Sequence, residues 1–354
     1  MIGATLPPAE FTKLLLAHYP LTRPLDYFAI PNGSNNRVVG IRSGHGEFVC
    51  KTILAPHNLA ALHHEQRLLH WLSNQELSFA VPASLPTHSG ELILHNEGSY
   101  HILTPLLPGQ KPDWHAPQQI ELVGAALGEL HPMLAAYPHA TADALPAYGA
   151  LKQIHPLVPA PDELTPHHLQ LPPTPATTGE LAWWREEMAA VRAFVEGPYL
   201  ALPRQLIHSD FGHSNTLYLA DTTDGRMTAV LDFEFAGPDV RAMDLASGLY
   251  FCMRIWENAQ PLLNAEAFCR GYAQQQQLTQ PEIEAIPWLM RLRNVASAIW
   301  WFGRRLAAGK APDVAERIGD LQQFVAWLDS AAGHNFAQIL QLLALPSEKT
   351  KGVL

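Results

Sequence analysis

Cysteine is scarce in this chain, and the three that occur, Cys50, Cys252 and Cys269, are widely spaced with no C-x-x-C pair. Such a set argues against a disulfide framework or a cysteine-based zinc site and favours a reducing compartment. Long hydrophobic runs are also missing. No apolar stretch is long enough to span a bilayer, and residues 1–20 lack the charged start and apolar core of a signal peptide. We therefore expect a soluble, cytoplasmic protein with no membrane partner.

Basic residues are few as well, with 23 Lys and Arg against 33 Asp and Glu and a formal net charge of -10. This balance argues against a nucleic-acid partner. What the chain does have is length, 354 residues, and a hydrophobic content of 47%. These values allow two domains or one large bilobal unit with a substantial core. The oligomeric state stays open.

The segment 206–244 contains two apolar runs that each adjoin acidic residues. Asp210 comes before the first run, and Asn215 lies five positions after Asp210. Asp232 directly follows the second run. Residues 221–225 between the runs, Asp-Thr-Thr-Asp-Gly, indicate a hairpin turn. A hairpin would bring Asp210, Asn215 and Asp232 to one end of the strand pair.

These side chains suit phosphoryl transfer to an alcohol. Asp210 would orient the acceptor hydroxyl and take its proton, while Asn215 and Asp232 would hold Mg²⁺ against the triphosphate of ATP. Glu234 would add to the metal site, face a cationic substrate or be a surface acid. Asp244 is expected to cap the following helix and to tie down the loop through Arg241.

The pattern H-x-D-x-x-x-x-N, followed by D-F-x, resembles the catalytic and metal-binding loops of protein-kinase-like enzymes. It is closer still to the aminoglycoside phosphotransferase family, which includes choline kinases and homoserine kinase type II. That family carries H-G-D-x-x-x-x-N, then I-D-F/W-E/D, and often D-L-A. The counterparts here are residues 208–215, 231–234 and 244–246, with Ser209 in place of the usual glycine.

The resemblance implies an α+β, bilobal, protein-kinase-like fold. Residues 1–104 would form a nucleotide-binding N-lobe made of an antiparallel sheet and a helix. Residues 105–354 would form a larger, mostly helical C-lobe that carries the catalytic and acceptor-binding residues. Its Pro-rich insertion at 138–178 would either cover the substrate site or be a surface excursion.

A metal-hydrolase cluster of His208, Asp210 and His213 is the alternative for the same segment. No further His-rich motif supports it. Two loops at the family's spacing and in its order, followed by D-L-A, favour the kinase-like interpretation.

Lys51 lies in V-C-K-T-I on the second of two predicted strands, 38–42 and 47–53. This strand resembles V-A-I-K, whose lysine contacts the α/β-phosphates. Apolar residues at helical spacing predict a helix over 58–74 with Glu65 in its middle. The resemblance implies that an ion pair between Lys51 and Glu65 directs the lysine toward the nucleotide.

The turn before these strands is the counterpart of the phosphate loop. Its polar residues would offer amide donors to phosphate oxygens, although its single glycine equally suits an ordinary hairpin turn. The residues are Asn32, Gly33, Ser34, Asn35 and Asn36.

Residues 104–109, T-P-L-L-P-G, resemble the hinge that holds adenine through backbone groups. Thr104 begins this segment. Pro105 has no N–H, so the donor would come from Leu106 or Leu107. The alternative is a Pro-rich linker between domains, and both interpretations imply a boundary near residue 105.

Helical patterns dominate the chain after residue 244. One of the predicted helices, 282–306, carries Arg291, Arg293 and Arg304. These cations would reach an acidic group of a substrate or form a solvated basic face.

The sequence therefore predicts a phosphotransferase that moves the γ-phosphoryl group of ATP, with Mg²⁺, to a hydroxyl of a small metabolite. Residues 230–246 most resemble the homoserine kinase type II branch of the family, and this resemblance implies a homoserine-like acceptor. Aminoglycosides, choline and ethanolamine are alternative acceptors. A catalytically silent, ATP-binding module is the alternative of another class.

Overall fold

The computed structural model describes residues 9–30, 37–54, 58–139, 144–220 and 225–344. Its chain forms two compact units, which we describe one at a time. Unit 1 comprises Met1–Gln110, Tyr137–Ala144 and Thr216–Glu234, and unit 2 comprises Lys111–Ala136, Leu145–Asn215 and Phe235–Leu354. The expected boundary between two domains near residue 105 stays a prediction. The compact units differ from it mainly because residues 216–234 join the first one.

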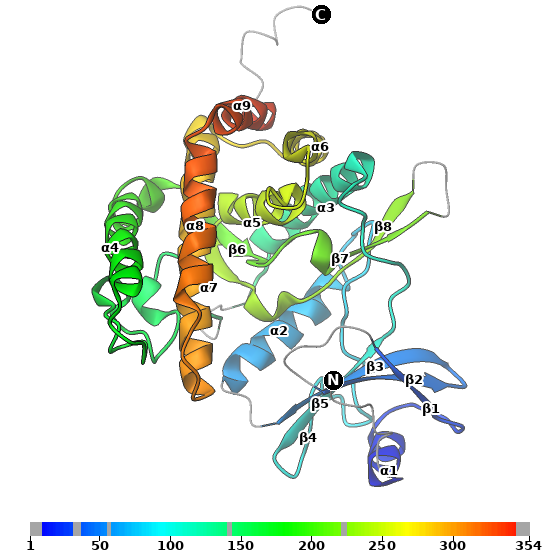
Figure 1. Ribbon diagram of the computed structural model, residues 1–354. Coiled ribbons are helices and arrows are strands. Elements are labelled where there is room, and N and C mark those ends of the chain that lie inside the picture. The colour runs from blue at the N-terminus through cyan, green and yellow to red at the C-terminus, as the bar shows by residue number, and fades with distance from the viewer. Residues whose placement is uncertain (1–8, 31–36, 55–57, 140–143, 221–224, 345–354) are drawn as a thin grey trace, which may run out of the picture. The chain divides into compact units, whose positions relative to one another are not determined.

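Unit 1 is built on a five-stranded sheet with the order β1-β2-β3-β5-β4, in which all neighbours are antiparallel. In Figure 1 the helices α1 and α2 lie on opposite sides of this sheet. In chain order the elements of unit 1 are α1 (Ala9–His18), β1 (Asp26–Ala29), β2 (Arg37–Ser43), β3 (Gly46–Leu54), α2 (Leu59–Leu72), β4 (Leu94–Asn96), β5 (Ser99–Pro105), β7 (Thr216–Leu219) and β8 (Arg226–Val230).

Side-chain alternation along β3 decides which residues meet which helix. Cys50 belongs to a buried cluster with Leu15 of α1, whereas Ile53 packs with Leu62 of α2. Because successive strand residues point to opposite faces, Lys51 shares the face of Ile53 and therefore lies on the α2 side.

The strands β7 and β8 form the predicted hairpin, and Thr216 pairs with Val230. The turn residues 221–224 lie outside the described residues. Backbone hydrogen bonds join this hairpin to the rest of unit 1, from Ala80 to β8 and from Gln110 to β7. These bonds explain why a segment from the middle of the chain belongs to unit 1.

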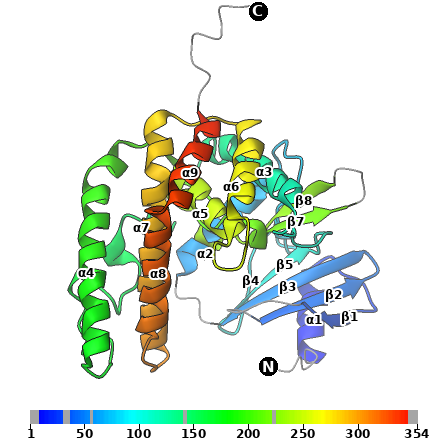
Figure 2. The same ribbon diagram turned by 45° about the horizontal axis from the view of Figure 1, so that its top comes forward.

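Unit 2 is mainly helical, and α4, α7 and α8 lie side by side (Figures 1 and 2). Its main elements are α3 (Pro117–Ala135), α4 (Pro175–Glu196), β6 (Arg204–Ile207), β9 (Gly237–Val240), α5 (Ala242–Met253), α6 (Pro261–Ala273), α7 (Gln280–Ala307), α8 (Val314–Leu328) and α9 (Ala331–Ile339). Short 3-10 helices are η1 (Leu151–Gln153), η2 (Pro161–Glu163), η3 (Pro198–Ala201), η4 (His213–Asn215) and η6 (Leu340–Leu343), and η5 (Phe233–Phe235) lies where the chain passes from unit 1 to unit 2.

Helices α3 and α6 approach each other closely through glycine. A Cβ atom on Gly271 would come within 1.9 Å of the carbonyl oxygen of Glu121, and one on Gly124 within 2.1 Å of that of Phe268. No side chain fits there, so these two positions require glycine.

The structure differs from the predicted elements at two places. Helix α4 begins at Pro175, inside the expected insertion 138–178, because Thr174 caps it by accepting from the N–H of Thr177 and proline suits the first helical position. The antiparallel pair of β6 and β9 was not predicted from the sequence. Among the described residues, no helix is long and apolar enough to cross a membrane.

Candidate active site

Lys51, in the middle of β3, forms an ion pair with Glu234. The Nζ atom of Lys51 lies 3.0 Å from Oε2 of Glu234. Glu234 sits in η5, just after β8. The pair therefore joins the central sheet of unit 1 to the end of its hairpin.

The expected partner of Lys51, Glu65 on α2, acts at longer range. Among the described residues, no Lys51–Glu65 ion pair within 4.0 Å is found. Burial on its own would lower the pKa of Lys51, but the charges of Glu65 and Glu234 outweigh it and raise that pKa. Burial also raises the pKa of Glu65 to about 7, against the lowering effect of Lys51. Lys51 thus pairs with Glu234, the less buried of the two acids, and not with Glu65, whose functional role stays a prediction.

Asp232 follows β8 with a left-handed backbone, at a φ of 58°. Its side chain is exposed and accepts no hydrogen bond from any residue that the structure describes. Left-handed residues other than glycine are strained, and such strain often accompanies a functional side chain. The carboxylate of Asp232 is therefore available to a cation.

The hinge residues follow β5. The N–H of Leu106 donates to the carbonyl of Glu47 at 2.9 Å, so the sheet already uses this expected adenine donor. The N–H of Leu107 donates to no backbone carbonyl within the described part of the chain, and it is the donor that stays available. Thr104 lies on β5 and remains a predicted contact. The predicted phosphate loop, Asn32 to Asn36, lies outside the described residues.

In unit 2, the segment after β6 carries Asp210 and Asn215. The Nδ2 atom of Asn215 donates to the backbone oxygen of Asp210 at 2.8 Å and to its Oδ2 at 3.0 Å. The carbonyl oxygen Oδ1 of Asn215 accepts no hydrogen bond from the described residues. This oxygen is therefore available as a metal ligand.

Asp244 fixes the backbone of the Asp210 loop. Its Oδ2 accepts from the N–H of His208 and its Oδ1 from the N–H of Ser209, both at 2.7 Å. Asp244 is fully buried in the first turn of α5. The expectation that Asp244 caps this helix and contacts Arg241 is wrong, because its carboxylate points to the loop and Arg241 instead pairs with Glu282.

Ser209 has a φ of 71°, which explains why the family usually has glycine there. Its backbone is held from two sides, since its N–H donates to Asp244 and its carbonyl accepts from the hydroxyl of Tyr148 at 2.8 Å. Tyr148 comes from the Pro-rich segment. This part of the segment therefore packs on the Asp210 loop and is not a surface excursion.

Arg293 of α7 lies beside Asp210. Its Nη2 is 3.7 Å from Oδ1 of Asp210, and its side chain is only 8% exposed, against 30% for Asp210. The other two arginines of interest make different contacts. Arg291 pairs with Glu187, and Arg304 lies over the ring of Trp300. The expectation that these arginines form a solvated basic face is therefore wrong for Arg293, because its side chain is buried.

The described residues contain no group of three or more His, Cys, Asp or Glu that could hold a metal ion. The metal-hydrolase alternative therefore lacks its site, and the Nδ1 atom of His208 instead accepts from the N–H of Asp210 at 3.3 Å. Mg²⁺ in kinases needs fewer protein ligands, because water and phosphates complete its shell. Asp232 of unit 1 offers an available carboxylate and Asn215 of unit 2 an available amide oxygen, both of them ligand types that Mg²⁺ prefers; that the two act on one ion stays a prediction.

A family model described as "Phosphotransferase enzyme family" matches residues 27–282, which is most of the chain. The chain belongs to the phosphotransferase enzyme family. It is thus an enzyme that transfers a phosphoryl group to a hydroxyl of a small molecule.

Curated relatives of this phosphotransferase include a homoserine kinase from Rhizobium meliloti (strain 1021), which is 26% identical over 299 residues and 82% of each chain. A homoserine kinase from Pseudomonas aeruginosa (strain LESB58) is 30% identical over 308 residues, covering 85% of this chain and 88% of the relative.

Two solved structures are similar in fold. A microcompartment-associated aminopropanol kinase has a TM-score of 0.68 at 15% identity, and the match covers 92% of this chain and 99% of the other. The amicoumacin kinase hAmiN, in complex with AMP-PNP, Ca²⁺ and Ami, has a TM-score of 0.65 at 16% identity, with 92% and 93% covered. These likenesses confirm the predicted α+β, protein-kinase-like fold.

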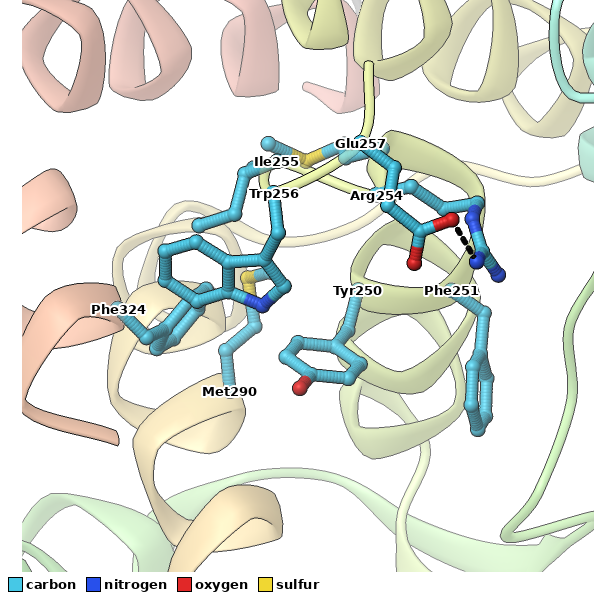
Figure 3. A pocket seen from close by; sticks show the side chains of 9 residues that line it. Tyr250, Phe251, Arg254, Ile255, Trp256, Glu257, Met290 and Phe324 are labelled. Carbon is cyan, nitrogen blue, oxygen red and sulfur yellow. Dashed lines mark hydrogen bonds and ion pairs between the residues drawn. The ribbon is translucent and has the colours of Figure 1, made fainter. Parts of the chain in front are cut away.

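A pocket of about 200 Å³ lies in unit 2 of this phosphotransferase, between α5, α7 and α8. Its walls are aromatic and aliphatic, and the ion pair of Arg254 and Glu257 lies at its edge (Figure 3). The lining side chains include Tyr250, Phe251, Trp256, Met290 and Phe324.

The sequence did not reveal the contacts that two residues, Tyr148 and Arg293, make at the Asp210 loop. Tyr148 lies in an irregular segment with no periodicity, so nothing in the sequence indicated its contact with the loop. Arg293 was noticed only as one of several helical cations, because its burial depends on the packing of α7 against α5. A buried arginine is unusual, but burial is not readable from a helix with arginines on several faces.

Proposed function

We propose that this phosphotransferase moves the γ-phosphoryl group of ATP to the hydroxyl of homoserine or of a closely similar hydroxy amino acid. The observation that carries this proposal is that the carboxylate of Asp210 is held in position by its neighbours and still reaches solvent. Asn215 donates to Oδ2 of Asp210, Arg293 lies beside Oδ1, and the side chain stays partly exposed to a substrate. An oriented, accessible carboxylate is what a general base for an alcohol requires.

Asp210 would accept the proton of the acceptor hydroxyl as the oxygen of that hydroxyl attacks the γ-phosphorus. The new O–P bond forms while the bond between the γ-phosphorus and the bridging oxygen breaks, and ADP leaves with that oxygen. The protein contributes mainly position and charge neutralisation to such a reaction.

Lys51 would leave Glu234 and contact the α- and β-phosphates. Glu65 would keep the ammonium group of Lys51 directed toward the nucleotide. The loop Asn32 to Asn36 would offer amide donors to the phosphates. Adenine would lie at Thr104 and Leu107, whose N–H is free of other backbone contacts among the described residues.

Asp232 and Asn215 would hold Mg²⁺, which neutralises the charge of the phosphates when it is bound. Glu234 would join the metal site once Lys51 turns to the nucleotide. The complex of one structural neighbour with AMP-PNP and Ca²⁺ supports a nucleotide and a divalent cation as cofactors.

The homoserine kinases among the relatives support the acceptor. A second candidate, an amino alcohol such as choline or ethanolamine, is favoured by the aromatic walls of the pocket, since aromatic faces attract organic cations. All three cysteines are buried, free thiols, which suits the reducing cytoplasm that we propose as the compartment.

A coupled assay for ADP tests the function on a panel of homoserine, choline, ethanolamine and an aminoglycoside. We expect Mg²⁺-dependent turnover that is fastest with homoserine. Asp210→Asn should lower kcat by roughly 100-fold or more, while the affinity for Mg-ATP measured by calorimetry stays within a factor of about three. Near-normal turnover by this variant would show that Asp210 is not the base.

Asp232→Ala provides the complementary measurement. It should weaken the calorimetric affinity for Mg-ATP at least about tenfold, because a metal ligand is lost. Asp320→Ala, at an exposed position on α8, is the matched control and should change nothing. A silent, nucleotide-binding module would bind Mg-ATP and turn over none of the panel.

A further inference from the structure

Arg293 is a buried cation at the predicted site of phosphoryl transfer, in a position that the proposed mechanism does not yet use. The residue is 7% exposed, and a buried arginine requires compensation for the loss of water. Its position next to Asp210 supplies only part of that compensation, because their closest atoms are 3.7 Å apart, which is beyond hydrogen-bond length.

Three contacts from α5 hold the guanidinium in place. The Nε atom donates to Oγ of Ser247 at 3.2 Å. The carbon Cζ lies 4.7 Å from the ring centre of Tyr250 and 4.2 Å from that of Phe251. Both rings also line the pocket in Figure 3. Cation–π contacts of this kind fix the plane of the group.

The terminal nitrogens of Arg293 nevertheless keep their donor capacity. They donate no hydrogen bond to any residue in the described part of the chain. They are also not among the described polar atoms that are sealed from solvent without a hydrogen-bond partner. A rigid guanidinium with unused donors that solvent can reach is a ready site for a planar anion.

We infer that Arg293 binds the carboxylate of the acceptor and so selects hydroxy acids over simple alcohols, an inference that rests on the proposed function. A hydroxyl hydrogen-bonded to Asp210 lies next to the guanidinium. In homoserine the carboxylate is only a few bonds from that hydroxyl, so one molecule can reach both groups. Asp210 itself is an acid, and Asp244 binds the backbone of its loop, so an acceptor carboxylate beside that loop requires a cation to offset their repulsion.

The experiment compares two acceptors that differ only in the carboxylate: L-homoserine and 3-aminopropan-1-ol. The kcat/KM values of both are measured for the wild type, for Arg293→Gln and for Arg293→Lys. The wild type should favour homoserine. Arg293→Gln should lower kcat/KM for homoserine about 100-fold, mostly through KM, and that for aminopropanol less than about fivefold. Arg293→Lys should fall in between, because lysine keeps the charge but loses the fork of donors.

Arg291→Gln is the matched control. Arg291 also lies on α7, over the ring of Trp288, and pairs with a buried acid, Glu187. Its loss removes a comparable packed cation without touching Asp210. It should lower the melting temperature and leave the preference between the two acceptors unchanged.

Two results would overturn the inference while the kinase function stands. Equal losses for both acceptors in Arg293→Gln would mean that Arg293 acts on Asp210 or on the phosphoryl group. Wild-type turnover of aminopropanol without turnover of homoserine would mean that no carboxylate is bound. Turnover of neither acceptor, nor of any other alcohol in the panel, would instead refute the proposed function itself.

Discussion

A single buried residue sets the conformation of the loop that carries the predicted base. Asp244 is fully buried, and its two carboxylate oxygens each accept a backbone N–H from the loop. His131 adds a third contact, with Nε2 at 3.4 Å from Oδ2. Hydrogen bonds to an ionised acceptor are stronger than neutral ones. The strained φ of Ser209 can therefore persist without a glycine.

Asp244→Asn tests this anchor with almost no change of shape. The new amide group can accept only one of the two N–H groups, and its own NH₂ would face the other. We expect the free energy of unfolding to fall by about 2–3 kcal/mol, which corresponds to a melting temperature lower by roughly 3–4 °C in a chain of 354 residues. kcat should fall as well, because the loop places Asp210.

Calorimetric unfolding and the ADP assay measure these two effects. Asp320→Asn, on the exposed face of α8, serves as the control for loss of one negative charge. If Asp244→Asn unfolds at the wild-type temperature and keeps the wild-type kcat, the loop does not depend on this carboxylate.

At the scale of elements, the segment between α3 and α4 supports the active site from one side. The N–H of Tyr148 donates to Oδ2 of Asp239 on β9 at 2.8 Å, and its hydroxyl donates to the carbonyl of Ser209. Asp239 is itself held by the hydroxyl of Tyr199. The segment is thus joined both to the β6–β9 pair and to the loop that this pair introduces.

Tyr148→Phe removes only the bond to Ser209. A net loss of about 1 kcal/mol in the free energy of unfolding is expected for one such bond, together with a fall in kcat of a few-fold and an unchanged KM for ATP. Tyr100→Phe on β5, a partly buried tyrosine whose ring stacks on His95, is the control. A wild-type kcat in Tyr148→Phe would mean that the segment covers the loop without positioning it.

The helices and strands that could be predicted from the sequence are those whose pattern lies within a few neighbouring residues. The helix α1 and the strand β3 follow from apolar spacing within a few residues of each other, and Lys51 could be placed on β3 for that reason. The strands β6 and β9 are only four residues long, and they pair across a long separation. Their pairing, like the burial of Arg293, depends on which segments meet in the folded chain, and no local pattern encodes that.

The choice of Glu234 over Glu65 as the partner of Lys51 has the same origin. The sequence shows that both acids exist, but only the folded arrangement determines which carboxylate lies within 4.0 Å of the Nζ atom of Lys51. That property belongs to the molecule as a whole.

At the scale of the whole molecule, the protein has more acidic than basic residues, and three acids of unit 1, Glu65, Glu234 and Asp232, act on the charge of Lys51. The negative charges of Glu234 and Asp232 raise the pKa of Glu65 further, in addition to the effect of burial, whereas Lys51 and a hydrogen bond with Gln66 lower it. Glu65 therefore keeps its proton in the ligand-free protein at mildly acidic pH and releases it near pH 7. A positively charged ligand such as Mg²⁺ would shift this balance.

The stability of the protein should therefore depend on pH through Glu65. The pKa of this carboxyl is about 7 in the folded protein against 4.5 as the reference value, so the folded state keeps a proton that the unfolded state has released. The resulting stabilisation is complete below pH 4.5 and is lost as the pH rises to about 7. Glu65→Gln carries no such proton. The difference in the free energy of unfolding, variant minus wild type, should accordingly rise between pH 5 and pH 8, by at most about 3 kcal/mol.

Urea unfolding of both proteins at several pH values, without nucleotide or Mg²⁺, measures this difference. Other titrating groups act equally on both chains, so subtracting the two curves isolates Glu65 even in a protein of net charge -10. Glu76→Gln, at an exposed position of unit 1, should run parallel to the wild type. If the curve of Glu65→Gln runs parallel as well, Glu65 is ionised throughout and balances Lys51 as a full negative charge.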